Sequence, residues 1–78
     1  MKKKIKLIWQ FSGMDARKIA DHHLVHLNEY LNREDIFVVD KGTELTNEFS
    51  AISFITIDNS LVEKLRVDLK PHKGFLVE

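Results

Sequence analysis

The stretch KIKLIWQF, residues 4–11, determines how the fold begins. Its large apolar residues recur at every second position, as Ile5, Leu7, Trp9 and Phe11. A period of two is typical of a β-strand that has one face in a core and the other in water. Ile8 is the one apolar residue among the lysines and the glutamine of the other side. The stretch therefore predicts a half-buried strand.

A helix is predicted directly after this strand. Ser12 precedes Asp15 by three residues, which is the spacing of a capping box, so we expect Ser12 to cap a helix that runs to about Arg33. At 100° per residue, one broad face of this helix collects the apolar residues and one histidine. These are Ala16, Ile19, Ala20, His23, Leu24, Leu27, Tyr30 and Leu31. The helix is amphipathic and suited to cover a sheet.

The remaining segments carry strand and helix signals in turn. β-branched and aromatic runs predict strands, and leucines at helical spacing, closed by Pro71, predict a second helix. Glycine and asparagine between the first two of these strands predict a turn-rich connection. In order, we expect a strand at 36–40, a connection at 41–48, a strand at 50–57, a helix at 61–69 and a strand at 75–77.

The resulting order, strand-helix-strand-strand-helix-strand, is typical of the ferredoxin-like fold. Right-handed crossovers would place both helices on one face of a four-stranded antiparallel sheet with the strand order 4-1-3-2. A chain of 78 residues has room for one core, so we expect a single domain over residues 1–78. The predicted class is an α+β two-layer sandwich.

Composition narrows the classes of function. Twelve basic and twelve acidic residues cancel, which disfavours a nucleic-acid binder. The chain has no cysteine, which favours the reducing cytoplasm. A basic start at residues 1–4 is followed by an apolar run that Lys6 and Gln10 interrupt, so neither a secretion signal nor a membrane span is expected.

Side-chain alternation predicts a partner for the sheet face that no helix covers. In the strands expected at 36–40, 50–57 and 75–77, both alternating sets are apolar, so one set must face away from the helices. A large exposed apolar patch usually marks an interface. We therefore expect a homodimer, with Ile8, Phe37, Phe54 and Leu76 in its interface. Scattered apolar residues on an ordinary surface are the alternative.

The segment HHLVH, residues 22–26, is the most unusual part of the sequence. His22 and His26 lie one helical turn apart, a spacing at which two imidazoles can share a zinc, nickel or copper ion. Glu29 could add an oxygen ligand and His72 a fourth group if the fold brings them near. The alternative is that His22 is a solvated surface residue.

His23 points toward the centre of the apolar helix face. It could line a ligand pocket together with Tyr30 and Trp9, or it could be a packed and hydrogen-bonded core residue. No nucleophile or carboxylate pair completes a catalytic site in the sequence. We therefore predict a non-enzymatic binding or regulatory domain whose ligand is unknown. The alternative is a metal-binding protein or a small enzyme that uses the histidine segment.

Overall fold

The computed structural model describes residues 3–77, so Met1 and Lys2 of the basic start, and Glu78, lie outside the described residues. The helices in that range lack the combination of length and apolar composition that a membrane-spanning helix needs. The elements are β1 (Lys4–Ser12), α1 (Ala16–Arg33), β2 (Asp40–Asn47), β3 (Ser50–Asp58), a 3-10 turn η1 (Asn59–Leu61), α2 (Val62–Leu69) and β4 (Lys73–Val77).

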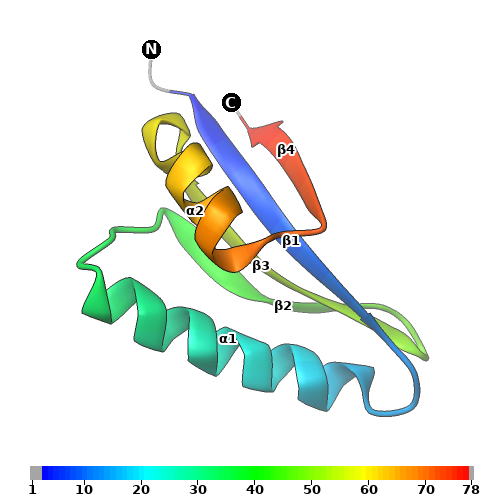
Figure 1. The fold of residues 1–78 in the computed structure, drawn as a ribbon. Helices are drawn as coiled ribbons and strands as arrows, with labels where there is room; N and C mark the ends of the chain where they lie inside the picture. Colours follow the sequence, from blue (N-terminus) through cyan, green and yellow to red (C-terminus); the bar gives the residue numbers. More distant parts are fainter. Residues whose placement is uncertain (1–2, 78) are drawn as a thin grey trace.

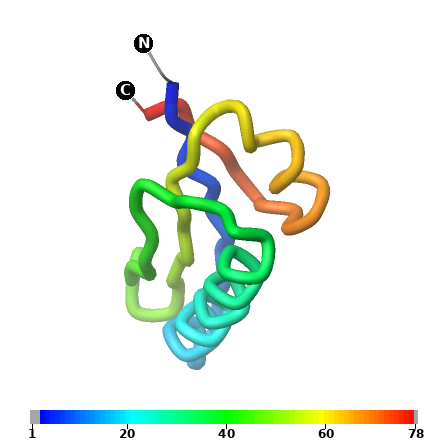
Figure 2. Tube along the Cα trace, turned by 90° about the vertical axis from the view of Figure 1, so that its left-hand side faces the viewer, coloured from blue at the N-terminus to red at the C-terminus, as the bar shows by residue number. Residues whose placement is uncertain are grey.

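The four strands form one antiparallel sheet, and both helices lie on the same side of it (Figures 1 and 2). The strands lie in the order β2-β3-β1-β4, which is β4-β1-β3-β2 when counted from the opposite edge. The predicted α+β class, with four antiparallel strands and two helices, is confirmed.

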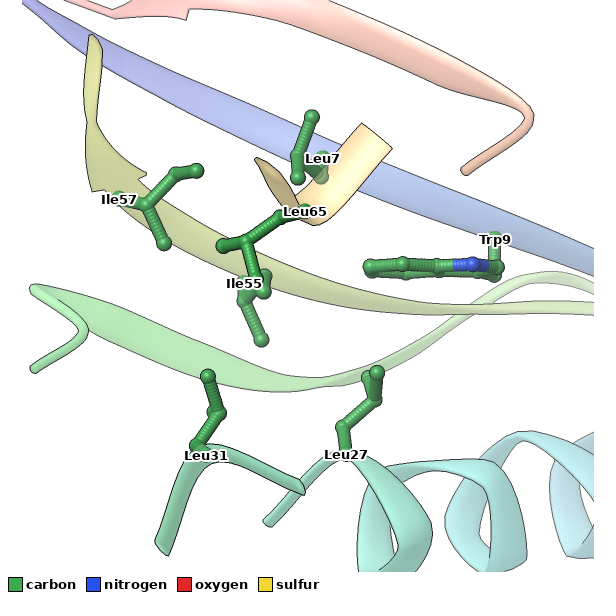
Figure 3. Close-up of a cluster of buried hydrophobic side chains, with 7 residues drawn as sticks. All are labelled: Leu7, Trp9, Leu27, Leu31, Ile55, Ile57 and Leu65. Atoms are coloured by element: carbon green, nitrogen blue, oxygen red, sulfur yellow. The ribbon is translucent and has the colours of Figure 1, made fainter. Parts of the chain in front are cut away.

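The core lies between the helices and the inner strands. Leu27 and Leu31 point from α1 toward the sheet, and Leu65 contributes the one buried side chain of α2 (Figure 3). The sheet contributes Leu7, Trp9, Ile55 and Ile57. All seven are nearly inaccessible to water, and burying a side chain of this size contributes about 1.5–3 kcal/mol to folding.

The predicted start of the first helix is wrong. Ser12 is the last residue of β1, where it pairs with Ser50, and the helix begins at Ala16 with no side-chain cap. Gly13 makes the turn between strand and helix at φ 114°, a conformation that favours glycine, and its N–H donates to the Phe49 carbonyl at 2.8 Å. Ser12, which the sequence spacing predicted as the helix cap, is therefore part of a strand pair instead.

The predicted second strand is also misplaced. β2 begins at Asp40 rather than at residue 36, and it covers most of the segment expected to be a connection. Ile36 and Val38 pack against the core from a non-strand segment. The run at 36–39 is apolar because two of its side chains pack against the core, and it forms no strand. The actual strand, β2, is a mostly polar strand at the edge of the sheet.

The second helix is confirmed, with a 3-10 turn before it. The Asp58 carboxylate accepts the Ser60 N–H at 3.1 Å and so caps this turn. The helix ends at Leu69, and Lys70 follows in the left-handed region at φ 48°. β4 then begins at Lys73, two residues before the predicted strand.

Register assigns each strand residue to one of the two sheet faces, because residues directly opposite each other share a face. Leu7 pairs with Ile55 on the helix-covered face, and Ile8 pairs with Phe54 on the other, which we call the open face. The open face comprises Asp40, Gly42, Glu44, Ser50, Ile52, Phe54, Thr56, Asp58, Lys4, Lys6, Ile8, Gln10, Ser12, Lys73, Phe75 and Val77.

Two of the four residues predicted for the open face are elsewhere. Phe37 precedes β2 and belongs to no strand, so alternation does not apply to it. Leu76 pairs with Ile5 and lies on the helix side at the sheet edge, while Phe75 takes the open face. Ile8 and Phe54 are on the open face, as predicted. The error at Leu76 arises because both alternating sets of β4 are apolar, and only pairing distinguishes them.

Candidate functional site

The three histidines of the HHLVH segment diverge in the structure. His22 and His26 are exposed on the outside of α1, while the half-buried His23 ring points to the sheet. Among residues 3–77, no group of three or more histidine, aspartate or glutamate side chains is arranged to hold a metal ion. Glu29 and His72 therefore do not complete a site with the histidine pair.

His22 and His26 contact each other directly. Their Nε2 atoms lie 3.0 Å apart, and their ring centroids lie 4.5 Å apart with the rings nearly perpendicular at 86°. The distance is short because one turn of α1 separates the two residues, which places their side chains on the same side of the helix. The contact leaves two imidazole nitrogens together in water.

His23 fills a different place, between α1 and the first and third strands. Its Nδ1 lies 2.8 Å from the Ser53 Oγ, and its ring packs at a tilt on Trp9 and Phe11, with centroids 5.1 and 5.3 Å away. Burial lowers the pKa of His23, and the imidazoles of His26 and His72 lower the pKa further. The ring is therefore neutral at pH 7.

The His23–Ser53 pair is a structural contact. Ser53 is completely buried, so a substrate cannot reach its hydroxyl. A buried hydroxyl without a partner destabilises a fold, and the imidazole provides that partner. The pair therefore secures α1 to the middle of β3.

His72 lies in the segment between α2 and β4. Its Nδ1 accepts the Gln10 backbone N–H at 2.8 Å, while the backbone N–H of His72 donates to the Ile8 carbonyl at 2.9 Å. β4 pairs with β1 only as far as Ile8, so the imidazole replaces the strand at the next position. Because Nδ1 accepts, the proton of the neutral ring is on Nε2.

The predicted ligand pocket of His23, Tyr30 and Trp9 is not formed by these residues together. Trp9 is in the core, where its indole N–H donates to the Leu69 carbonyl at 2.9 Å. Tyr30 instead lines an open hollow of about 520 Å³ between the helices, with its hydroxyl donating to Asp68 at 2.5 Å. The pKa of Tyr30 is raised by burial and then by this bond.

A second hollow, of about 450 Å³, lies where β1 and β3 extend beyond the end of β4. Its polar lining consists of Gln10, Ser12, Thr46, Ser50 and His72. No aspartate, glutamate, lysine or arginine lines the hollow, so it offers mainly hydrogen bonds to a ligand. Of the candidate residues named from the sequence, His72 lies at this hollow, away from the His22–His26 pair.

The centre of the open face is covered by its own neighbours. Phe54 lies over Gly42 of the adjacent strand, where an added Cβ would come within 3.2 Å of the ring, and the Lys6 ammonium lies 4.3 Å from the ring centroid on the neighbouring strand. Ile8, Ile52 and Phe54 are consequently only 7–8% exposed, although no helix residue belongs to their cluster. The prediction of a large bare apolar patch is therefore wrong.

Charge on the open face is divided between its two sides. The carboxylates of Asp40 and Glu44 stand on β2 at one edge. The ammonium groups of Lys4, Lys6 and Lys73 stand on β1 and β4 at the other. One further carboxylate, that of Asp58, lies at the end of β3 opposite Lys4. The face therefore has an acidic and a basic side around a small apolar centre.

Sequence reasoning missed the acidic side of this face because it assigned residues 41–48 to a connection. The available signal was the hairpin turn: Asn47 Oδ1 accepts the Phe49 N–H at 2.8 Å, as asparagine does in tight turns. A turn at residues 47–50 requires a strand directly before it. That strand would have placed Asp40 and Glu44 on one face by alternation.

Comparison of the chain with protein-family models, with curated proteins and with solved structures finds no match. The function must be inferred from the geometry of the molecule alone.

Proposed function

We propose that this chain is a small, non-enzymatic binding or regulatory domain of the ferredoxin-like type that acts in the cytoplasm as a homodimer. The observation that supports the dimer is the open face, with its acidic and basic sides around the apolar centre of Ile8, Ile52 and Phe54. A dimer with two-fold symmetry uses the same surface on both copies, so that surface must complement itself.

A two-fold axis parallel to the strands, between β3 and β1, makes the face complementary to itself. Rotation about it puts β2 of the second copy over β4 of the first, and Phe54 over Ile8. Lys73, Ile8, Phe54 and Gly42 form one row across the sheet. Lys73 would therefore lie over Gly42 of the second copy, flanked by that copy's Asp40 and Glu44.

The Phe54 ring determines what Lys73 of the second copy would meet in this row. The ring lies over Gly42, which has no side chain of its own, so the incoming lysine would rest on the ring, between the two carboxylates. Phe75, which is 51% exposed on the same face, would add apolar area next to the basic side. Since the apolar centre is already shielded, electrostatic complementarity supplies orientation and partner choice more than affinity.

Sedimentation equilibrium over a wide concentration range tests the proposal. The wild-type chain is expected to associate to twice its 9.1 kDa, and added salt should weaken the association. Lys73→Glu should abolish it, because two like charges would meet the carboxylates of the second copy. The double variant Asp40→Lys, Glu44→Lys should be monomeric for the same reason.

The decisive experiment mixes the two variants and measures whether they associate with each other. A Lys73→Glu chain and an Asp40→Lys, Glu44→Lys chain should form a heterodimer, since their faces then carry opposite charges. Lys41→Glu is the matched control, because it makes the same charge change on the helix side of β2. A monomeric wild type, or equal effects of Lys41→Glu and Lys73→Glu, would refute the proposal.

A further inference from the structure

The exposed histidine pair on α1 has a geometry that its burial or packing does not explain. His22 and His26 are both exposed, and their Nε2 atoms lie 3.0 Å apart. A hydrogen bond between two side chains in water contributes little to stability, since each ring could bond to water instead. The pair therefore brings two metal-ligating nitrogens together without a structural need.

The distance between the nitrogens matches what one metal ion requires. Imidazole nitrogens bind zinc at about 2.0–2.1 Å. Two such ligands at ordinary coordination angles are then separated by roughly 2.9–3.4 Å. The Nε2 atoms at 3.0 Å already satisfy this separation, so an ion can bind without a change in the backbone of α1.

The pair would bind an ion through lone pairs alone. When both rings are neutral, the Nε2–H of one ring donates a hydrogen bond to the Nε2 lone pair of the other in the observed contact. In a complex both rings would carry their proton on Nδ1, and both Nε2 lone pairs would point to the ion. The exchange needs only a tautomer shift in one exposed ring.

We infer that His22 and His26 form a two-imidazole clamp for a divalent transition metal. Divalent copper should bind tightest, followed by nickel and zinc, because nitrogen sites follow that general order. No third histidine, aspartate or glutamate side chain of the described part of the chain joins the pair. The remaining coordination positions are therefore open to water or to a donor from another molecule.

Isothermal titration calorimetry of the full, untagged chain with copper, nickel or zinc chloride tests this inference. We expect one ion per chain, and a rise in melting temperature because the ion binds the folded helix. His22→Ala and His26→Ala should each weaken copper binding by at least about tenfold, which corresponds to about 1.4 kcal/mol. Circular dichroism should show an unchanged fold, since both side chains are exposed.

A variant with the same number of histidines provides the sharpest control. His26→Ala combined with Glu29→His keeps four histidines but places two of them seven residues apart, which is two turns. That spacing cannot chelate one ion, so the affinity should fall to that of His26→Ala. Equal binding by this variant and the wild type, or no binding by the wild type, would overturn the clamp.

Discussion

The two faces of the sheet bury apolar side chains by different means. On the helix-covered face, Ile55 is sealed by side chains from α1 and α2 (Figure 3). On the open face, Ile52 and Phe54 are almost as inaccessible, yet their shielding comes from the sheet itself. A second layer is therefore not required for burial when long side chains lie across an aromatic ring.

The difference shows what alternation can and cannot say. Alternation assigns a residue to a face, because successive side chains of a strand point in opposite directions. It does not say how much of the residue is exposed there. Lys6 supplies an apolar stem as well as a charge, so a lysine on the polar side still covers apolar surface.

The largest expected effect is a difference in the free energy of unfolding between alanine variants of two isoleucines on opposite faces of β3. Ile55→Ala should lower the free energy of unfolding by about 2–5 kcal/mol, since it leaves a cavity between rigid layers. Ile52→Ala should cost only about 1–2 kcal/mol, because open-face neighbours can collapse onto the gap or admit water. Urea unfolding of both variants measures this. Equal losses would show that the open face is as tightly enclosed as the core.

A second comparison concerns the contact between helix and sheet. Ser53→Ala removes the partner of the His23 imidazole and should destabilise the chain by about 1–3 kcal/mol. Ser50→Ala, at the start of the same strand and half-buried, is the control and should change stability by less than about 0.5 kcal/mol. If Ser53→Ala is also neutral, the contact does not secure α1.

The third prediction is a pH dependence of the metal-free chain. Because the pKa of His23 is lower in the folded state, the unfolded chain binds the proton first. The contribution of His23 is complete above about pH 6.5 and is lost as the pH falls from there through the folded-state pKa. In the His23→Gln variant, the free energy of unfolding should therefore depend less on pH in this range. An unchanged curve, or an equal effect of His22→Gln, would contradict the assignment.

The smallest expected effect separates the stem of Lys6 from its charge. Lys6→Met keeps the apolar stem over Phe54 and should cost about 0.5–1 kcal/mol through the lost cation–π contact. Lys6→Ala should cost more, because it also uncovers the ring. Thermal unfolding distinguishes the two. If both variants behave alike, charge rather than coverage protects the open face.

The elements with one apolar side were predicted best. β1, α1 and β3 each combine a clear period with many apolar residues, and their positions follow from that pattern. β2 was misplaced because an edge strand needs only a few packed residues and is mostly polar. The apolar run at 36–39 looked more like a strand, but it satisfies burial from an irregular segment.

The candidate sites also differ in whether they depend on neighbouring or on distant residues of the chain. The His22–His26 spacing is local, so the sequence located the pair, and helix geometry fixed their proximity. The predicted pocket of His23, Tyr30 and Trp9 required three side chains to converge from different positions. Local periodicity put them on compatible faces but could not show that Trp9 and His23 fill the space themselves.

The sequence by itself determined the class of the fold, the order of the elements and the parity of β1 and β3, because these depend on nearest neighbours along the chain. Tertiary structure alone decided which residues of β2 and β4 share the open face. It also decided how Phe54 is covered and what His23 contacts. These features depend on pairing between distant segments, whose energies no single segment contains.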